Sequence, residues 1–168
     1  MNWSSSRLLS VSVGSIIIAP NLQAKPPYDA LKNFAPVSEI ADVPFFIFTS
    51  PAALTAKTLK ELVEAAKKGG FTFASAGVGS ATHWAAERLR LSAGFQATHV
   101  PFRGGPEALT EVMTGRVDFM CIGVSSGLAF IQENKLIPLA VCTPKRTAAL
   151  PQVPTTLESG LPDSDYTF

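Results

Sequence analysis

The sequence predicts an α/β fold with a mostly parallel sheet and helices on both faces. Short apolar runs alternate with helical patterns along the chain from Pro44 onward. Alternation at this spacing is typical of βαβ units, whose successive strands run parallel. Hydrophobic residues make up 46% of the 168 residues and charged residues only 16%. The chain therefore has enough apolar side chains for a core and is not a disordered tail.

The expected elements follow one another in a regular order. A capping-box pattern, Thr58-Leu-Lys-Glu61, begins the first helix, Gly94 ends the second, and Pro106 suits the first position of the third. Beyond residue 144 the chain changes character, because prolines interrupt it and only 155–159 has a helical pattern. The expected strands are 45–49, 71–74, 97–100, 117–122 and 137–142, and the expected helices 58–68, 80–93, 106–114 and 126–134.

The first 25 residues allow two interpretations. Arg7 precedes an apolar run at 8–19, and Gln23-Ala24-Lys25 resembles a cleavage region, as in a short signal peptide. Alternatively, residues 8–13 form a strand that belongs to the fold. The apolar run itself is too short to span a bilayer.

Charge and cysteine content exclude several classes of partner. Fourteen basic and thirteen acidic residues give a net charge of +1 with no run of either sign, which argues against nucleic acid or an anionic membrane surface. Two histidines and two cysteines stand in no ligand spacing, so we expect no metal and no other cofactor. Cys121 and Cys142 both fall in apolar runs, which favours buried free thiols over a disulfide.

The most informative stretch is a strand, a loop of small residues at 75–79, and a helix that opens at Ser80. Glycines let a backbone approach a ligand closely, serine is a favoured N-cap, and a helix N-terminus favours an anion. The loop is neither a phosphate P-loop nor a dinucleotide fingerprint, because its glycines lack the required spacing and followers. An ordinary tight strand-to-helix turn explains the same residues.

Two further connections, 101–105 and 123–126, are expected at the same edge of the sheet. Both are rich in Gly or Ser and lead into helices. In open parallel sheets, ligands bind beyond the carboxyl ends of the strands. Together the three connections are expected to form a pocket of N–H and hydroxyl donors suited to a carboxylate.

Of the three larger polar side chains near these loops, two have both a binding and a structural explanation. His83, in the first turn of its helix, either donates to a bound anion or is a satisfied structural residue. Arg103 either pairs with a ligand carboxylate or is a solvated or interlobe arginine. His99 falls in a strand and is expected in the core. These loops contain no Gly-x-Ser-x-Gly elbow and no carboxylate beside a histidine, so we expect no catalytic residue.

Several stretches, in one order along the chain, resemble a single bacterial family. The family is the periplasmic substrate-binding proteins of tripartite tricarboxylate transporters, also called Bug proteins, and the resemblance spans residues 8–162. The stretches are Tyr28-Asp-Ala-Leu-Lys-Asn-Phe-Ala-Pro-Val37, Phe73-Ala-Ser-Ala-Gly-Val-Gly-Ser80, Thr98-His-Val-Pro-Phe-Arg-Gly104, Leu139-Ala-Val-Cys-Thr-Pro-Lys-Arg146, Ala149-Leu-Pro-Gln-Val-Pro-Thr155 and Glu158-Ser-Gly-Leu-Pro162.

The resemblance implies a two-lobed, Venus-flytrap binding protein of the periplasm, monomeric and without catalytic activity. Such proteins capture a small carboxylate between their lobes and deliver it to membrane permease subunits. Family ligands include dicarboxylates, tricarboxylates, acidic amino acids and aromatic acids. The residues that match the second-lobe ligand loop are Ser75, Gly77, Gly79, Ser80 and His83, and those that match the first-lobe loop are Gly14 and Ser15.

The resemblance also implies a division of the chain and a truncation at both ends. Residues 1–43 correspond to a partial first lobe and crossover, 44–141 to the second lobe, and 142–168 to the return crossover. Family members are nearly twice as long and carry a Pro-Gly-Gly loop on the other side of the cleft. We therefore expect one complete lobe, and ligand binding that is weak or absent, as in a non-functional fragment.

Two other classes of function remain open from the sequence. One is the ligand-sensing effector domain of a transcription regulator, although no helix-turn-helix or basic segment precedes the lobe. The other is a small transferase that uses the loop at 75–80, although no nucleophile and base pair is evident. The sequence does not name the carboxylate.

Overall fold

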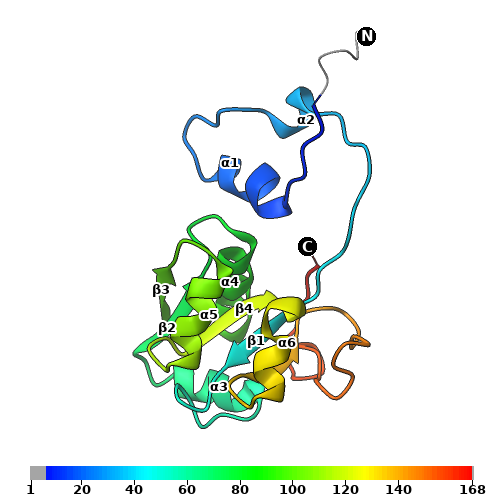
Figure 1. Ribbon diagram of the computed structural model, residues 1–168. Helices are drawn as coiled ribbons and strands as arrows, with labels where there is room; N and C mark the ends of the chain where they lie inside the picture. Colours follow the sequence, from blue (N-terminus) through cyan, green and yellow to red (C-terminus); the bar gives the residue numbers. More distant parts are fainter. Residues whose placement is uncertain (1–6, 168) are drawn as a thin grey trace.

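The computed structural model describes residues 7–167, and a five-stranded sheet with helices on both faces is its centre (Figure 1). The strands lie in the order β3-β2-β4-β1-β5. They are β1 (Phe45–Thr49), β2 (Phe71–Ser75), β3 (Ala97–Pro101), β4 (Phe119–Gly123) and β5 (Ile137–Val141). The helices that cover them are α3 (Leu59–Ala66), α4 (Ala81–Ala93), α5 (Gly105–Met113) and α6 (Val124–Gln132). All the strands and helices expected over 45–142 are present.

The sheet is mixed rather than mostly parallel. Strand β2 runs parallel to both neighbours, with Phe73 opposite His99 of β3 and opposite Phe119 of β4. Strand β1, in contrast, is antiparallel to β4 and to β5. The prediction of a mostly parallel sheet is therefore correct for β3-β2-β4 and wrong for β1. The reason is that β1 begins at the edge where β4 ends, with Phe45 opposite Gly123.

Two apolar layers hold the helices against the sheet. Strand residues alternate between the faces, as the period of two requires. Ile47, Phe73 and Phe119 face α3 and α4, whereas Phe48 and Met120 face α5 and α6. The helix ends follow the signals in the sequence, since the Thr58 hydroxyl accepts from the Glu61 N–H at 3.2 Å and Gly94 ends α4 in the left-handed conformation, φ 68°.

Residues 7–33 form a separate helical segment that an extended connection joins to β1 (Figure 1). The segment contains a π-helical turn, η2 (Gly14–Ile18), followed by the short helices α1 (Ala19–Asn21) and α2 (Ala30–Asn33). Of the two interpretations of this region, the one with a strand at 8–13 is wrong. The Ser12 carbonyl accepts the N–H groups of Ser15 and Ile16, both at 3.1 Å, so the backbone turns into a helix where a strand would have to continue. Among residues 7–167, no helix is long and apolar enough to cross a membrane.

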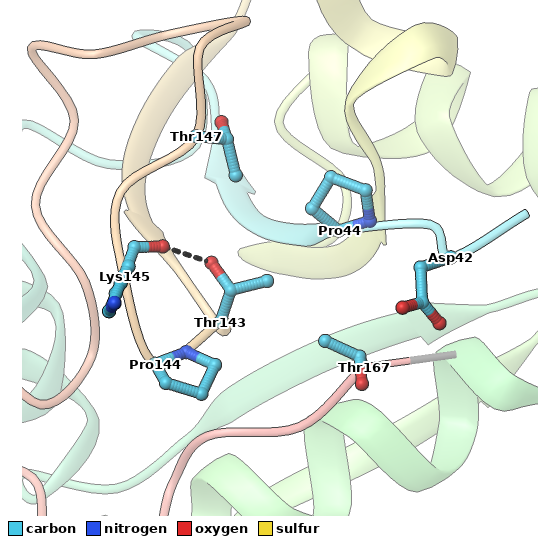
Figure 2. Close-up of a pocket in the computed structure, with 7 residues that line it drawn as sticks. All are labelled: Asp42, Pro44, Thr143, Pro144, Lys145, Thr147 and Thr167. Carbon is cyan, nitrogen blue, oxygen red and sulfur yellow. Dashed lines mark hydrogen bonds between the residues drawn. The ribbon is translucent and has the colours of Figure 1, made fainter.

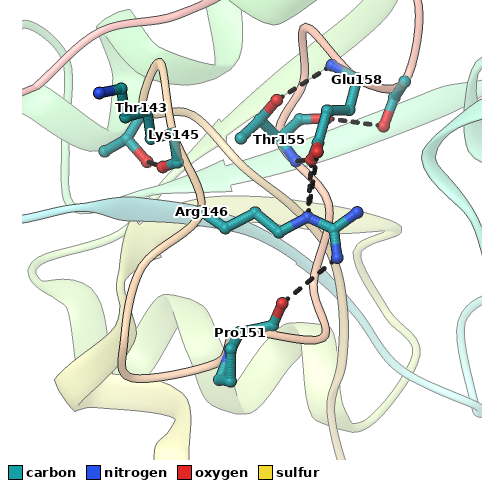
Figure 3. Close-up of polar contacts among 7 residues, drawn as sticks. Thr143, Lys145, Arg146, Pro151, Thr155 and Glu158 are labelled. Carbon is teal, nitrogen blue, oxygen red and sulfur yellow. Dashed lines mark hydrogen bonds and ion pairs between the residues drawn. The ribbon is translucent and has the colours of Figure 1, made fainter.

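The stretch after β5 folds back beside the sheet, and an ion pair between Arg146 and Glu158 joins its two arms (Figure 3). The Arg146 guanidinium donates to the Glu158 carboxylate at 2.8 Å and to the Pro151 carbonyl at 3.3 Å. Glu158 and Thr155 cap each other, but residues 155–159 form turns, so the expected helix there is wrong. An isolated bridge between Val141 and Thr155 attaches this stretch to β5.

The prediction of two buried free thiols is confirmed. Cys121 and Cys142 are both free and inaccessible, in the layer under α3 and α4. Burial raises the pKa of the Cys142 thiol to about 12 and raises the pKa of the Cys121 thiol well above its usual range.

We therefore expect both thiols to be inert in the native chain, because the thiolate is the reactive form and neither thiol reaches solvent. A disulfide-exchange reagent should label neither cysteine at neutral pH and both after unfolding in guanidinium chloride. Stoichiometric labelling within seconds under native conditions would contradict this arrangement of the core.

Candidate functional site

Three connections lie side by side at the carboxyl edge of β2, β3 and β4, as predicted. Strand β2 ends at Ser75, and its carbonyl accepts the Phe102 N–H at 3.0 Å, which brings the connection after β3 against the loop at 75–80. At the end of β4, α6 follows Gly123 directly, so the third connection is a strand-to-helix junction without a separate loop. The edge thus carries the N-termini of α4, α5 and α6.

The loop at 75–80 is held by its own hydrogen bonds. Gly77 and Gly79 have φ values of 120° and 78°, which L side chains rarely adopt. The Ser80 hydroxyl lies 2.7 Å from the Gly77 carbonyl and accepts the His83 N–H at 3.2 Å, so it caps α4 as predicted. Thr82 accepts the Ala76 N–H at 2.8 Å. These contacts fix the loop before any ligand arrives.

Two histidine rings stack beside this loop. The His83 and His99 rings lie 3.9 Å apart at 12°, and Phe73 lies 4.9 Å from His99. The His83 Nδ1 accepts the Gly79 N–H at 3.2 Å, so a neutral His83 carries its proton on Nε2. Partial burial lowers the pKa of both histidines; the charge of His83 lowers that of His99 further, and Glu87 opposes the shift in each.

His99 is the site residue that the sequence missed. It was expected in the core, but its half-buried ring lies against His83, and its Nε2 lies 2.6 Å from the Ser75 hydroxyl. The Ser75 side chain is fully buried and faces His99 and Gly77. Its position favours a role in holding the loop. No local sequence signal marks this contact, because it depends on the register between β2 and β3, which pairs Phe73 with His99.

The predicted first-lobe residues divide into one that reaches the loop and one that does not. A Cβ added to Gly14 would lie 2.8 Å from the Ala81 nitrogen, so the backbone of η2 touches the first residue of α4. Gly79 in turn faces Ala19, where an added Cβ would lie 3.5 Å from the Ala19 Cβ. Ser15 is exposed, and its hydroxyl donates to the Ser12 carbonyl at 2.9 Å.

Arg103 is exposed on the connection after β3. Its backbone N–H donates to the Glu107 carboxylate at 3.2 Å, which helps to begin α5. Arg103 therefore lies at the predicted edge of the sheet. Its side chain is exposed there and is not packed into the core.

A separate cavity of about 450 Å³ lies where both crossovers leave the sheet (Figure 2). A second cavity of about 710 Å³ lies within the helical segment at 16–33. The predicted ligand-loop residues line neither of these two cavities. Residues that line the first are Asp42, Pro44, Thr143, Pro144, Lys145, Thr147 and Thr167.

The resemblance found in the sequence is confirmed by comparison with known families. Residues 7–167 match the family described as the tripartite tricarboxylate transporter family receptor. The chain belongs to this family. A curated relative from Agrobacterium vitis is 34% identical over 162 residues, covering 94% of this chain and 45% of the relative. Protein BugT from Bordetella pertussis is 30% identical over 158 residues, covering 93% and 48%.

Solved structures of this family share the fold. The periplasmic binding protein BugD superposes with a TM-score of 0.84 at 29% identity, covering 92% of this chain and 52% of that one. MatC from Rhodopseudomonas palustris with bound malate gives 0.77 at 26%, covering 92% and 51%. An R. palustris protein with adipate gives 0.80 at 26%, covering 86% and 48%. The chain spans about half the length of the relatives it matches, and the α/β fold of periplasmic binding proteins is shown.

We expect Gly14→Ala to detach the helical segment from α4, because the new methyl group would overlap the Ala81 nitrogen. Hydrogen exchange at residues 14–22 should accelerate at least tenfold, which corresponds to a loss of about 1.4 kcal/mol in local stability. Exchange in the core strands should stay unchanged. Ser15→Ala, one residue further along, is the matched control, and equal effects of the two variants would contradict the contact.

We also expect stability to fall as the pH decreases from about 7.5 to about 5.5. Because the pKa of both histidines is lowered in the folded chain, the unfolded chain binds protons first below about pH 6.5. Thermal unfolding over this range should show Tm decreasing, and the double variant His83→Phe, His99→Phe should flatten the profile. An unchanged slope in that variant would assign the pH dependence to other groups.

Proposed function

We propose that this chain captures a small carboxylate as part of an extracytoplasmic solute-binding protein of a tripartite tricarboxylate transporter. Membership of the receptor family and the malate and adipate bound by two structural neighbours support this proposal. The observation that carries it is the N-terminus of α4, with a rigid glycine loop in front of it and the backbone of Gly14 beside it.

The arrangement suits an anion for three reasons. The first N–H groups of a helix, here those of Ala81 and Thr82, have no acceptor within their own helix, and the helix dipole adds positive potential. The neutral His83 keeps an Nε2–H donor. Loop groups that are already hydrogen-bonded, such as the Gly79 N–H, need no reorganisation when a ligand binds.

Segments from two parts of the chain would surround the ligand. The loop at 75–80 belongs to the predicted second lobe, and Gly14 to the predicted first lobe. A carboxylate that contacts both would stabilise the closed arrangement of the lobes, because a ligand shifts an equilibrium by its difference in affinity for the two states. Delivery to permease subunits, a periplasmic location and a monomeric state are parts of the same proposal. The effector-domain and transferase alternatives gain no supporting observation.

Thermal unfolding of the chain with a panel of carboxylates tests this proposal. The panel contains C4 to C6 dicarboxylates, citrate, glutamate and benzoate, each paired with its neutral amide as control. A ligand at about 100 times its dissociation constant adds about 2.7 kcal/mol, which raises Tm by several degrees in a domain of this size. Because the chain spans about half the length of its relatives, we expect weak binding, so that one carboxylate class raises Tm only at high concentration and its amide has no effect. A chain that no carboxylate stabilises, or that amides stabilise equally, would contradict carboxylate capture.

A further inference from the structure

One buried hydroxyl connects strand β3 to the first glycine of the ligand loop. The Ser75 Oγ lies 2.6 Å from the His99 Nε2 and accepts the Gly77 N–H at 3.1 Å. Ser75 itself is fully buried at the end of β2. Its side chain is therefore inaccessible to a ligand. The hydroxyl links the His99 ring to the Gly77 backbone by hydrogen bonds.

His99 is held firmly enough to act as a support. Its backbone is paired in β3 opposite Phe73, and its ring stacks on Phe73 at 17° and on His83 at 12°. His83 holds the second glycine of the loop through the Gly79 N–H at 3.2 Å. Each of the two loop glycines is thus tied to one member of the same ring pair.

Both hydrogen bonds hold glycine backbone, which has other conformations available. At φ 120°, Gly77 lies outside the common backbone regions, and glycine has many alternatives to that conformation. Without the Ser75 hydroxyl, the Gly77 N–H would lose its acceptor, and Gly77 would be held only through its carbonyl, by the N–H and hydroxyl of Ser80. The orientation of the loop N–H groups would then be less firmly fixed.

We propose that His99 is a positioning residue for ligand binding, which acts through the Ser75 hydroxyl on Gly77 and contacts no ligand itself. The inference rests on the proposed function, since it assigns a purpose to the loop geometry. It adds a residue of β3 to a site otherwise built from β2, α4 and the helical segment.

Three substitutions separate positioning from packing. His99→Phe keeps a flat ring in the stack and removes Nε2. His99→Gln places an amide within reach of the position of Nε2, so it can restore the hydrogen bond to Ser75. Ser75→Ala removes the hydroxyl from the other side, and Thr98→Ala, at an exposed neighbour in β3, is the matched control.

The first readout is the dissociation constant for the carboxylate that most stabilises the wild-type chain, measured by calorimetry. His99→Phe and Ser75→Ala should each weaken binding about tenfold, as expected for one lost hydrogen bond. The double variant should also lose about tenfold, because both changes remove the same connection. His99→Gln should recover most of the loss, and Thr98→Ala should bind as wild type. A hundredfold loss in the double variant, or no recovery with Gln, would overturn the inference.

The second readout needs no ligand. In ¹H–¹⁵N spectra, the amide signals of Gly77 and Gly79 should shift in His99→Phe, whereas that of Gly94, at the far end of α4, should stay in place. Unmoved Gly77 and Gly79 signals would overturn the positioning role even if binding changed. A wild-type chain that binds no carboxylate would instead contradict the proposed function, and the two amide signals would still decide the role of His99.

Discussion

The parallel register of β3, β2 and β4 is the constraint on which the site depends. It places the carboxyl ends of three strands at one edge, so three helices begin there with their N–H groups toward the same region. The Asp118 carboxylate supports the register between β2 and β4 at the opposite end, where it accepts the Thr72 N–H at 2.7 Å and the Thr72 hydroxyl at 2.8 Å. A shift by one residue would move His99 to the other face of the sheet.

The reversed strand β1 brings the connection from the helical segment to this same edge of the sheet. Because β1 begins at the edge where β4 ends, the connection at 34–44 meets the sheet at the same edge as the loop at 75–80, with β4 between β1 and β2. The return connection after β5 leaves from the same edge, with the cavity in Figure 2 between the two. The helical segment at 7–33 therefore lies near the N-terminus of α4. There Gly14 permits contact between the backbones of η2 and α4. The reversed strand β1 and the small residue Gly14 thus both allow the helical segment to contact α4.

The sequence could predict elements that local patterns determine, and it failed where distant pairing decides. Strands 45–49, 119–123 and 137–141 are marked by apolar runs, and α4 by its serine and glycine caps. The direction of β1 has no local signal, since a strand reads the same in both directions. Thr155 and Glu158 show the opposite case, because their capping hydrogen bonds form but Gly160 and Pro162 follow too closely for a helix to continue.

The same reasoning explains why the candidate site was predicted in part. The glycines and Ser80 are contiguous in the sequence, so their loop and its cap were visible. His99 was placed in the core because its partners, Ser75 and His83, belong to other elements and meet it only through the register.

Burial of the histidine pair shapes what the site can recognise. Since burial lowers the pKa of both rings, the neutral form of His83 is favoured, in which Nδ1 accepts the Gly79 N–H of the loop and Nε2 carries the proton. Arg103, the cation predicted for this edge, is exposed. In the proposed function, the attraction for an anion comes from oriented N–H groups and the end of α4. Oriented donors discriminate by geometry as well as by charge, so a carboxylate should be preferred over a spherical anion of the same charge.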